Sequence, residues 1–317
     1  MFKLEFDIPE ASDKINLSDQ ILLFGSCFSD EIGSILGHNK FISLSNPFGT
    51  IYNPVSIFKL LMDQVSPNHL VENQGVTYHW DTHGKISGLS EKETIELFTS
   101  KQKETQDFLA NSKWLIITLG TAIVYELENG IMVANCHKVP ATNFKKRFLE
   151  QREIIDHYQS LHTYLKKVNP DLKVVFTVSP VRHVRDGLIE NNRSKAILIN
   201  AIHTILKKHQ EVSYFPSFEI VMDELRDYRF FSSDMIHLSK EATSYVWERF
   251  AATYFDNDTK DFLKNWNKLK SAIDHKPFQP ESKQHQQFLK ITLEKLESLN
   301  EKVDLSVEIK QLKKKLK

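Results

Sequence analysis

The fold is decided by the stretch Ile21-Leu22-Leu23-Phe24-Gly25-Ser26-Cys27-Phe28-Ser29-Asp30. Its first four residues are apolar, and a short apolar run that ends at glycine is typical of a buried parallel strand. Residues 31–36 then carry apolar side chains at helical spacing. A strand that turns directly into a helix places the turn at the carboxyl edge of a sheet, where open α/β folds bind ligands. Because N–H groups at a helix start favour negative charge, this turn suits a nucleophile beside a developing oxyanion.

Further apolar runs and amphipathic segments alternate along the rest of the chain. This alternation predicts a parallel sheet with helices on both faces, that is, a three-layer α/β/α fold. The pattern also predicts an edge strand through Phe2, Leu4, Phe6 and Ile8, and a hairpin around Asn129-Gly130. The central strands are predicted at 40–44, 114–120, 174–180 and 212–218, and the helices at 54–63, 91–110, 145–167, 191–209 and 240–255.

Composition narrows the class of protein and its surroundings. The 317 residues carry 41 basic and 41 acidic side chains, which argues against nucleic acid or an anionic membrane as a partner. No stretch approaches the ~20 apolar residues of a membrane span, and the first residues lack an apolar signal core. The two cysteines, Cys27 and Cys136, exclude a disulfide framework and fit a reducing compartment. We therefore expect a cytoplasmic protein.

The composition shifts near Asp256-Asn257-Asp258, which predicts a main domain over 1–256 and a C-terminal helical extension over 257–317. Leucines and isoleucine recur at heptad spacing in the extension, in two registers that do not join at Val303-Asp304. Two interpretations remain: the helices pack back on the domain, or they mediate self-association as a coiled coil. The heptad positions are Leu289, Leu293 and Leu296, followed by Leu305, Ile309, Leu312 and Leu316.

A second informative stretch lies about 210 residues after the first. Asp234 and His237 are three residues apart and directly precede the helix predicted at 240–255. An Asp carboxylate can accept one imidazole N–H and so fix the tautomer, which leaves the other ring nitrogen to take a proton from a nucleophile. The pattern is common by chance, and a turn with a surface histidine is the alternative reading. Together with the first stretch it indicates a nucleophile–His–Asp arrangement.

These motifs resemble those of a known family. Residues 24–30 resemble the first block of the SGNH/GDSL hydrolases, Phe-Gly-Asp-Ser-Leu-Ser-Asp, and Asp234-x-x-His237 resembles their last block. Gly25-Ser26-Cys27-Phe28-Ser29 is more similar still to the motif that names the GSCFA family, which is grouped with the SGNH hydrolases. The resemblance spans roughly residues 15–255 and implies a flavodoxin-like sheet with a hydrolase site. Further motifs of that family are similar to residues 46–50, 118–122 and 178–183.

The resemblance implies roles for individual residues. Cys27 aligns with the nucleophilic serine of the superfamily, and a one-residue shift would place Ser26 there instead. We favour Cys27, because a thiol at a helix N-terminus near a histidine can have a lowered pKa. A small buried cysteine is the alternative reading. His237 is then the base and Asp234 orients it.

Oxyanion and substrate contacts are the less complete part of the resemblance. Gly49 matches the second block, with Asn46 nearby, whereas the third block, Gly120-Thr121-Ala122, has alanine where the superfamily has a donating asparagine. The Thr121 hydroxyl is a substitute donor. Four further side chains follow predicted strands and are candidates for the oxyanion or for an anionic group on the substrate; they are Asn135, His137, Arg182 and His183.

We expect no cofactor, and no metal, because Cys136, His137 and His183 do not have the spacing of a zinc site. The function predicted first is an acyl hydrolase, which includes esterase, thioesterase or acyltransferase, acting on a small-molecule or carbohydrate ester. A catalytically decayed ligand- or carbohydrate-binding module is the alternative. A scaffold that assembles through its C-terminal helices is the third hypothesis.

Overall fold

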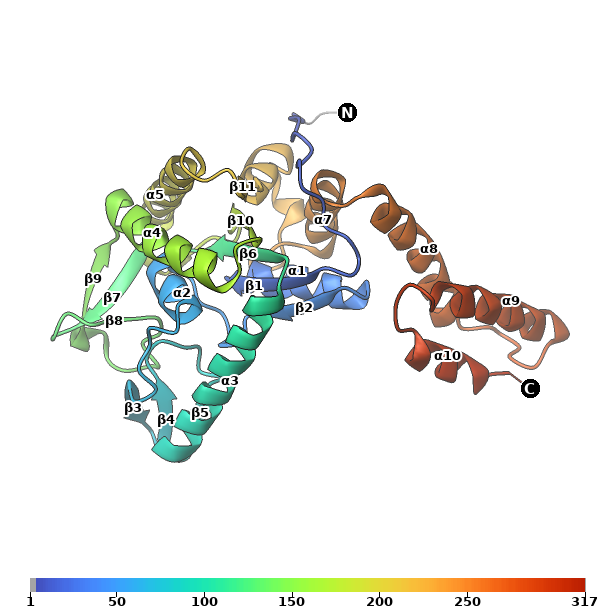
Figure 1. Cartoon of the computed structure of the whole chain (residues 1–317), viewed down its shortest axis with the longest axis horizontal. Helices are drawn as coiled ribbons and strands as arrows, with labels where there is room; N and C mark the ends of the chain where they lie inside the picture. Colours follow the sequence, from blue (N-terminus) through green and yellow to red (C-terminus); the bar gives the residue numbers. More distant parts are fainter. Residues whose placement is uncertain (1–3, 317) are drawn as a thin grey trace.

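The computed structural model describes residues 4–316 and has a sheet of five parallel strands at its centre (Figure 1). The spatial order is β2-β1-β6-β10-β11, with β1 and β10 on either side of β6. Consecutive strands are added on opposite sides of β1, so the carboxyl ends of β1 and β6 form a topological switch point. The strands are β1 (Gln20–Gly25), β2 (Ile42–Ser45), β6 (Trp114–Leu119), β10 (Lys173–Val178) and β11 (Val212–Tyr214).

Helices cover both faces of this sheet, which confirms the predicted three-layer α/β/α fold (Figure 1). Strand residues alternate between the faces, since Leu22 and Phe24 belong to one buried cluster and Ile21 and Leu23 to the other. The first face packs against α2 (Pro54–Leu61), α3 (Glu91–Asn111), α4 (Gln151–Val168) and α5 (Leu188–Leu206), and the second against α1 (Cys27–His38) and α7 (Lys240–Tyr254).

Side-chain caps explain where several helices begin. Asn53 accepts a hydrogen bond from the Ser56 N–H at 2.8 Å, directly before Pro54 at the start of α2. Ser239, predicted as the N-cap of α7, accepts from the Ala242 N–H at 3.2 Å. The N-cap of α1, Ser26, directly follows the last residue of β1, so α1 begins at the carboxyl edge of the sheet.

Two small antiparallel sheets flank the first face of the main sheet (Figure 1). One sheet has the strand order β3-β4-β5, and the other has the order β8-β7-β9. Their strands are β3 (Leu70–Asn73), β4 (Val76–His79), β5 (Ser87–Gly88), β7 (Ile123–Leu127), β8 (Met132–Val133) and β9 (Phe144–Phe148). Short helical segments elsewhere in the chain are η1 (Ala141–Asn143), η2 (Val184–Asp186), α6 (Ser217–Glu219), η3 (Ile220–Glu224) and η4 (Tyr228–Phe230).

Strand β9 corrects the prediction of a helix beginning at Lys145. Phe148 continues the helical spacing of Ile154, Ile155 and Tyr158, but it pairs with Ile123 of β7. Arg147 of β9 forms ion pairs with Glu126 of β7 at 2.7 Å and with Glu153 of α4 at 2.8 Å. The helix begins only at Gln151, after a capping box around Glu150.

The predicted N-terminal edge strand does not form over Leu4, Phe6 and Ile8, and Phe2 lies outside the described residues. The Phe6 N–H donates to the buried Glu224 carboxylate at 3.0 Å, and the Phe6 carbonyl accepts from the Arg249 guanidinium. Side chains thus satisfy this backbone in place of a neighbouring strand.

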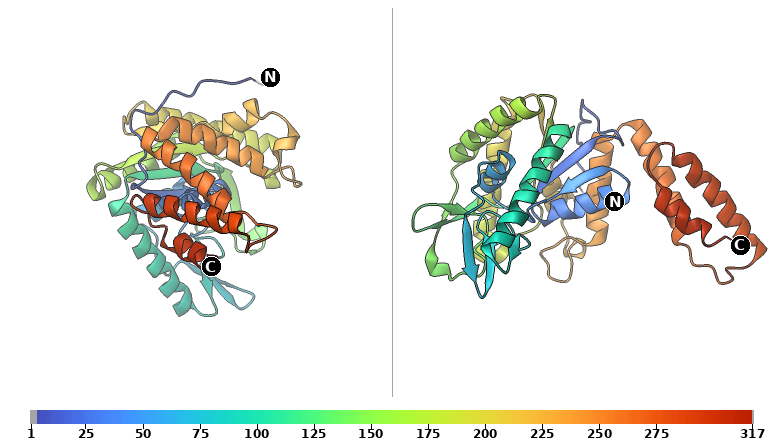
Figure 2. Two further views of the ribbon diagram at one scale, coloured as in Figure 1. Left: turned by 90° about the vertical axis from the view of Figure 1, so that its right-hand side faces the viewer. Right: turned by 60° about the horizontal axis from the view of Figure 1, so that its bottom comes forward.

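The C-terminal helices extend from one end of the sheet domain (Figure 2). Leu289, Leu296, Leu305 and Leu312 of the heptad pattern are all buried within the chain, where α9 and α10 pack on each other. The helices are α8 (Asn257–Asp274), α9 (Lys283–Leu299) and α10 (Ser306–Lys313). The boundary predicted at residue 256 falls at the N-cap of α8, but the second buried cluster continues from the sheet into all three helices.

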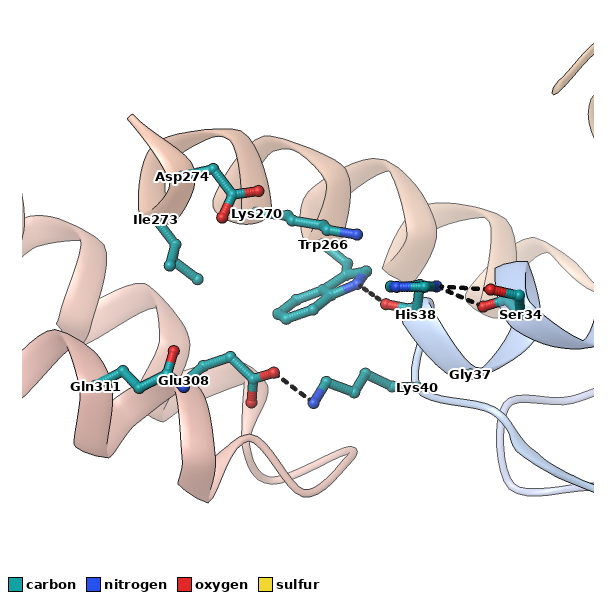
Figure 3. A pocket seen from close by; sticks show the side chains of 10 residues that line it. All are labelled: Ser34, Gly37, His38, Lys40, Trp266, Lys270, Ile273, Asp274, Glu308 and Gln311. Carbon is teal, nitrogen blue, oxygen red and sulfur yellow. Dashed lines mark hydrogen bonds and ion pairs between the residues drawn. The ribbon is translucent and has the colours of Figure 1, made fainter. Parts of the chain in front are cut away.

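Two polar contacts fasten this extension to the end of α1 (Figure 3). The Trp266 indole N–H donates to the His38 carbonyl at 2.9 Å, and the Lys40 ammonium pairs with Glu308 at 2.6 Å. Between them lies a cavity of about 480 Å³. Within residues 4–316 the structure contains no helix with both the length and the apolar character that a bilayer crossing requires.

Candidate functional site

The turn from β1 into α1 depends on a glycine. Gly25 has φ +137°, and a Cβ at this position would lie 2.1 Å from the Thr118 carbonyl oxygen of β6. The next residue, Ser26, donates its N–H to the same carbonyl at 3.2 Å. This close approach of β1 to β6 fixes the first residues of α1 at the switch point.

Asn46 locks the turn from the side of β2. Its amide oxygen accepts from the Gly25 N–H at 2.8 Å, and its amide nitrogen donates to the Asp30 carboxylate at 2.7 Å. The residue is buried, with a left-handed backbone at φ +42°. Because both ends of the amide are engaged, Asn46 holds the turn in place, and a direct contact with substrate would require these bonds to break.

Ser26 and Cys27, the two candidate nucleophiles, occupy different environments. Ser26 is only 1% exposed, and its hydroxyl caps α1 by accepting from the Phe28 N–H at 3.3 Å. Cys27 is the first residue of α1 and is partly exposed. The geometry therefore favours Cys27 as the residue that a substrate reaches.

The electrostatic environment of Cys27 corrects one expectation. Backbone hydrogen bonds from the N–H groups of Phe28 and Cys27 lower the pKa of the thiol, as predicted for a helix start. Burial acts more strongly in the opposite direction, and the carboxylates of Glu31 and Asp30 add to it, so the pKa is raised to about 11. The prediction of a lowered thiol pKa is wrong, because sequence spacing does not show the burial or the two acids.

The structure contains the predicted pairing of Asp234 with His237. The His237 Nδ1 lies 2.6 Å from the Asp234 Oδ2, while the other carboxylate oxygen accepts from the backbone N–H groups of Ile236 and His237. The hydrogen bond from the His237 ring, followed by these backbone bonds, lowers the pKa of Asp234 to about 2. The carboxylate is therefore ionised at neutral pH and fixes the tautomer that leaves His237 Nε2 free.

Glu31 connects the thiol and the imidazole electrostatically. Its charge raises the pKa of Cys27, and the His237 charge in turn lowers the pKa of Glu31 against the stronger effect of burial. The Thr243 hydroxyl of α7 donates to Glu31 at 3.1 Å, which joins the start of α1 to the helix after the Asp234–His237 loop. Within the described residues the Cys27 sulfur makes no hydrogen bond to the His237 ring.

The proposed oxyanion donors are engaged in local structure. The Gly49 N–H donates to the Asn46 carbonyl at 2.7 Å. The Thr121 hydroxyl bonds to the Ser194 hydroxyl at 3.0 Å and accepts from the Ile123 N–H at 3.0 Å. Gly120 has a different use, because a Cβ there would lie 3.0 Å from the Tyr52 ring. An oxyanion role for Gly49 or Thr121 therefore requires these bonds to rearrange.

Asn135 and His137 pack against the β3–β4 hairpin. The Asn135 carboxamide oxygen accepts from the His137 N–H at 3.0 Å. The His137 ring stacks on Tyr78 at 4.7 Å and bonds through Nε2 to the His79 carbonyl at 2.9 Å. Burial lowers the pKa of His137 to about 4, so the ring is neutral at physiological pH. These contacts describe a structural junction between two small sheets.

Arg182 supports the loop that carries Asp234 and His237. Its guanidinium lies 4.1 Å from the centre of the Phe231 ring and donates to the Met235 carbonyl at 3.1 Å. His183, the next residue, lies 3.6 Å from the Asp186 carboxylate, and burial lowers its pKa. Its ring is 6.5 Å from that of Tyr52. Both residues thus lie beside the site, Arg182 on the side of the His237 loop.

Lys195, a buried lysine in α5, lies at this edge of the sheet and was not predicted from the sequence. It is 2% exposed, and its ammonium donates to the carbonyls of Gly120 at 2.8 Å and Ser179 at 2.7 Å, at the carboxyl ends of β6 and β10. Burial lowers its pKa to about 7, an effect that the Cys27 charge opposes. The available signal was its position three residues before the buried Leu198 on the apolar face of the helix.

Tyr52 is a second missed residue of the site. The charge of Cys27 contributes to the raised pKa of its phenol, for which burial is the main cause. Its backbone carbonyl accepts from the N–H groups of Gly120 and Thr121. The phenol is thus a hydrogen-bond donor near the thiol that the motif comparison does not include.

A groove of about 660 Å³ begins at Lys195 and Arg182. It runs between α5 and the segment 218–231, and most of its lining is apolar. Lys195 connects this groove with the thiol, because it lines the groove and its pKa responds to the charge of Cys27. The apolar lining of the groove includes Leu188, Ile199, Phe218, Val221, Met222, Tyr228 and Phe231, and its further polar lining comprises Asn192, Asp223, Arg226 and Asp227.

Two family models match the chain. The GSCFA family matches residues 20–250, and the GSCFA domain protein, C-terminal domain, matches residues 266–317. The chain therefore belongs to the GSCFA family, as its first motif indicated. A comparison with curated proteins finds no significant match.

Proposed function

We propose that the protein is an acyl hydrolase or acyltransferase of the SGNH type, acting on a small-molecule or carbohydrate ester or thioester through Cys27. The main observation is that a partly exposed thiol at a helix start and a hydrogen-bonded Asp234–His237 pair each interact with the same carboxylate, Glu31, which also accepts from Thr243 of α7. The pair and the thiol share Glu31 as an electrostatic neighbour. The resemblance of both motifs to the SGNH/GDSL blocks supports the same reaction class.

The reaction follows from these groups. The Cys27 sulfur attacks the carbonyl carbon while His237 Nε2 takes the thiol proton, and the imidazolium is stabilised by Asp234. The C–O or C–S bond then breaks, and the leaving alcohol or thiol takes the proton back from His237. Water, or an acceptor alcohol, then gives a proton to His237 and attacks the acyl carbon; the C–S bond breaks, and the Cys27 sulfur takes that proton back. With a thiol pKa of about 11, this base is needed at neutral pH.

Oxyanion stabilisation is assigned to the N–H of Cys27 together with the Tyr52 phenol. The Cys27 N–H faces the sulfur at the helix start, where the helix dipole favours a developing negative charge. Tyr52 supplies a neutral donor beside the thiol, in place of the engaged Gly49 and Thr121 groups. The groove from Lys195 to Phe231 would accept the apolar part of the acyl group.

Turnover of p-nitrophenyl acetate and of an acyl thioester tests this proposal. Cys27→Ala and His237→Ala should each reduce turnover by at least about 10²-fold. Cys136→Ala is the matched control, since Cys136 is the other partly exposed thiol and its pKa is also raised by burial. Turnover that is unchanged in both test variants would remove the enzyme hypothesis.

The second candidate is a catalytically decayed module that binds a carbohydrate or small ester. The raised thiol pKa and the engagement of Gly49 and Thr121 favour it. A thiol-selective probe at neutral pH distinguishes the two. Where His237 acts as its base, Cys27 labels faster relative to Cys136 in the wild type than in His237→Ala, whereas a decayed site gives the same ratio in both proteins.

A further inference from the structure

Two histidines and a glutamate converge on the opposite edge of the sheet from Cys27. His162 lies on α4, whereas His209 and Glu211 lie in the segment between α5 and β11. One ligand atom from each of the three residues lies within 4.8 Å of those of the other two. His162 Nε2 is 2.5 Å from the Glu211 carboxylate, and the rings of His162 and His209 are 4.1 Å apart. All three groups are therefore within reach of one small cation.

An unpaired buried hydroxyl lies against the same cluster. Tyr158 is fully buried, and its hydroxyl has no hydrogen-bond partner among the described residues. Its ring centre lies 5.5 Å from that of His209 and 6.3 Å from that of His162. A buried hydroxyl without a hydrogen-bond partner lowers the stability of the folded protein by about 1–3 kcal/mol unless a water or another ligand bonds to it. This is an independent sign that the cluster holds something besides protein atoms.

We propose that His162, His209 and Glu211 form a Zn²⁺ site whose fourth ligand is a water that hydrogen-bonds to Tyr158. Two imidazoles and one carboxylate suit Zn²⁺, with an open fourth position. Sequence spacing gave no sign of it, because 49 residues separate His162 from Glu211. An ion here would join α4 to the start of β11, at the edge strand of the main sheet.

Two contacts within the cluster must change when a Zn²⁺ ion binds. The His162–Glu211 pair has to open by about 1 Å, because two ligands of one tetrahedral zinc stand farther apart than a hydrogen bond. Lys166 must also move, since its ammonium is 3.4 Å from the Glu211 carboxylate and repels a cation. Lys166 is exposed on the last turn of α4, where its ammonium also donates to the Pro170 carbonyl at 2.9 Å, a bond that can hold it away from the ion. Removal of this lysine should therefore strengthen binding.

Calorimetric titration of the full chain with ZnCl₂ tests the site. The wild type should bind one ion per chain and show a raised melting temperature with Zn²⁺. His209→Gln and Glu211→Gln should each weaken affinity by at least about tenfold, whereas Lys166→Met should tighten it several-fold. The control His157→Gln removes another histidine from α4, and the double variant Cys27→Ala/Cys136→Ala removes both thiols; neither should change affinity.

Circular dichroism of each variant without metal shows whether it is folded, and melting in the presence of Zn²⁺ gives a second readout. Loss of the Zn²⁺-dependent rise in Glu211→Gln, with a native spectrum, supports the site. Equal Zn²⁺ affinity in the wild type and Glu211→Gln would overturn it, as would affinity lost only in the double cysteine variant. A failure of turnover in the Cys27 experiments leaves this proposal intact, because the two sites share no residue.

Discussion

At Cys27, two electrostatic influences oppose each other within one helical turn. The backbone N–H groups at the start of α1 stabilise a thiolate, while burial, Glu31 and Asp30 disfavour it. The burial of the thiol follows from the fold, whereas the charges of Glu31 and Asp30 can be removed by substitution. These two acids are therefore the part of the site through which the thiol pKa can be changed. A thiol held in the protonated state resists unselective oxidation and alkylation and reacts only when a base is brought to it.

Glu31→Gln should therefore increase the reactivity of Cys27. The amide keeps an acceptor for the Thr243 hydroxyl but removes the charge that raises the thiol pKa. We expect iodoacetamide to label Cys27 about 3- to 10-fold faster at pH 8, measured by mass spectrometry relative to Cys136. Glu96→Gln, an exposed glutamate of α3, should leave the ratio unchanged. A slower reaction in Glu31→Gln would contradict this electrostatic account.

Lys195 makes stability depend on pH in a direction that can be predicted. Its pKa of about 7 in the folded protein lies below the value of ~10.4 in an unfolded chain. Between these values the unfolded state binds the additional proton, so the free energy of unfolding rises with pH. Relative to Lys195→Met, the wild type should gain about 2 kcal/mol between pH 7 and pH 9 in urea denaturation. The exposed Lys166→Met should show no such gain, and parallel pH profiles for wild type and Lys195→Met would refute the assignment.

At the scale of elements, apolar runs were enough to predict the sheet and most helices. The strand at 114–120 and the turn at Gly25 lie where the pattern placed them, because burial on both faces leaves a continuous apolar run. Strand β9 was missed because Phe148 continues the spacing of the apolar residues of α4, and only the pairing with β7 decides between strand and helix. Local patterns therefore predict elements whose own burial defines them.

The candidate site was predictable only where residues are adjacent in sequence. Asp234 and His237 pair as expected because three residues separate them. Lys195 and Tyr52 were missed because tertiary packing brings each of them near Cys27. The pKa of Cys27 was predicted with the wrong sign for the same reason, since burial by distant segments exceeds the effect of the helix start.

Two glycine-to-alanine substitutions test whether the turn after β1 depends on the close approach of β1 to β6. Gly25→Ala should destabilise the protein by at least about 3–5 kcal/mol, because its Cβ would lie 2.1 Å from the Thr118 carbonyl oxygen. Gly37→Ala, in the last turn of α1 with nothing within 4 Å of its Cβ, should be neutral or stabilise by about 0.5 kcal/mol. Chemical denaturation measures both, and similar stabilities for the two variants would contradict the model of the turn.

On the scale of the whole molecule, the leucines of the C-terminal heptad pattern are buried by contacts within the chain itself. Leu289, Leu296, Leu305 and Leu312 are each at most 2% exposed, so the seam expected of a coiled coil is filled by α9 and α10 themselves. Sedimentation velocity of the full chain should therefore give a monomer. A dimer that disappears in a 1–275 truncation would favour the scaffold hypothesis instead, with exposed residues such as Phe278 as its contacts.

The extension and the sheet domain share one buried cluster, which makes Trp266 a test of their coupling. This indole is 2% exposed, donates to the His38 carbonyl at 2.9 Å and lies 5.5 Å from the Lys40 ammonium. Trp266→Ala should cost about 3–5 kcal/mol if the parts unfold together, whereas Phe278→Ala, in an exposed loop, should change stability by less than about 0.5 kcal/mol. Two separate urea transitions, with only the smaller one shifted in Trp266→Ala, would show instead that the extension folds as an independent domain.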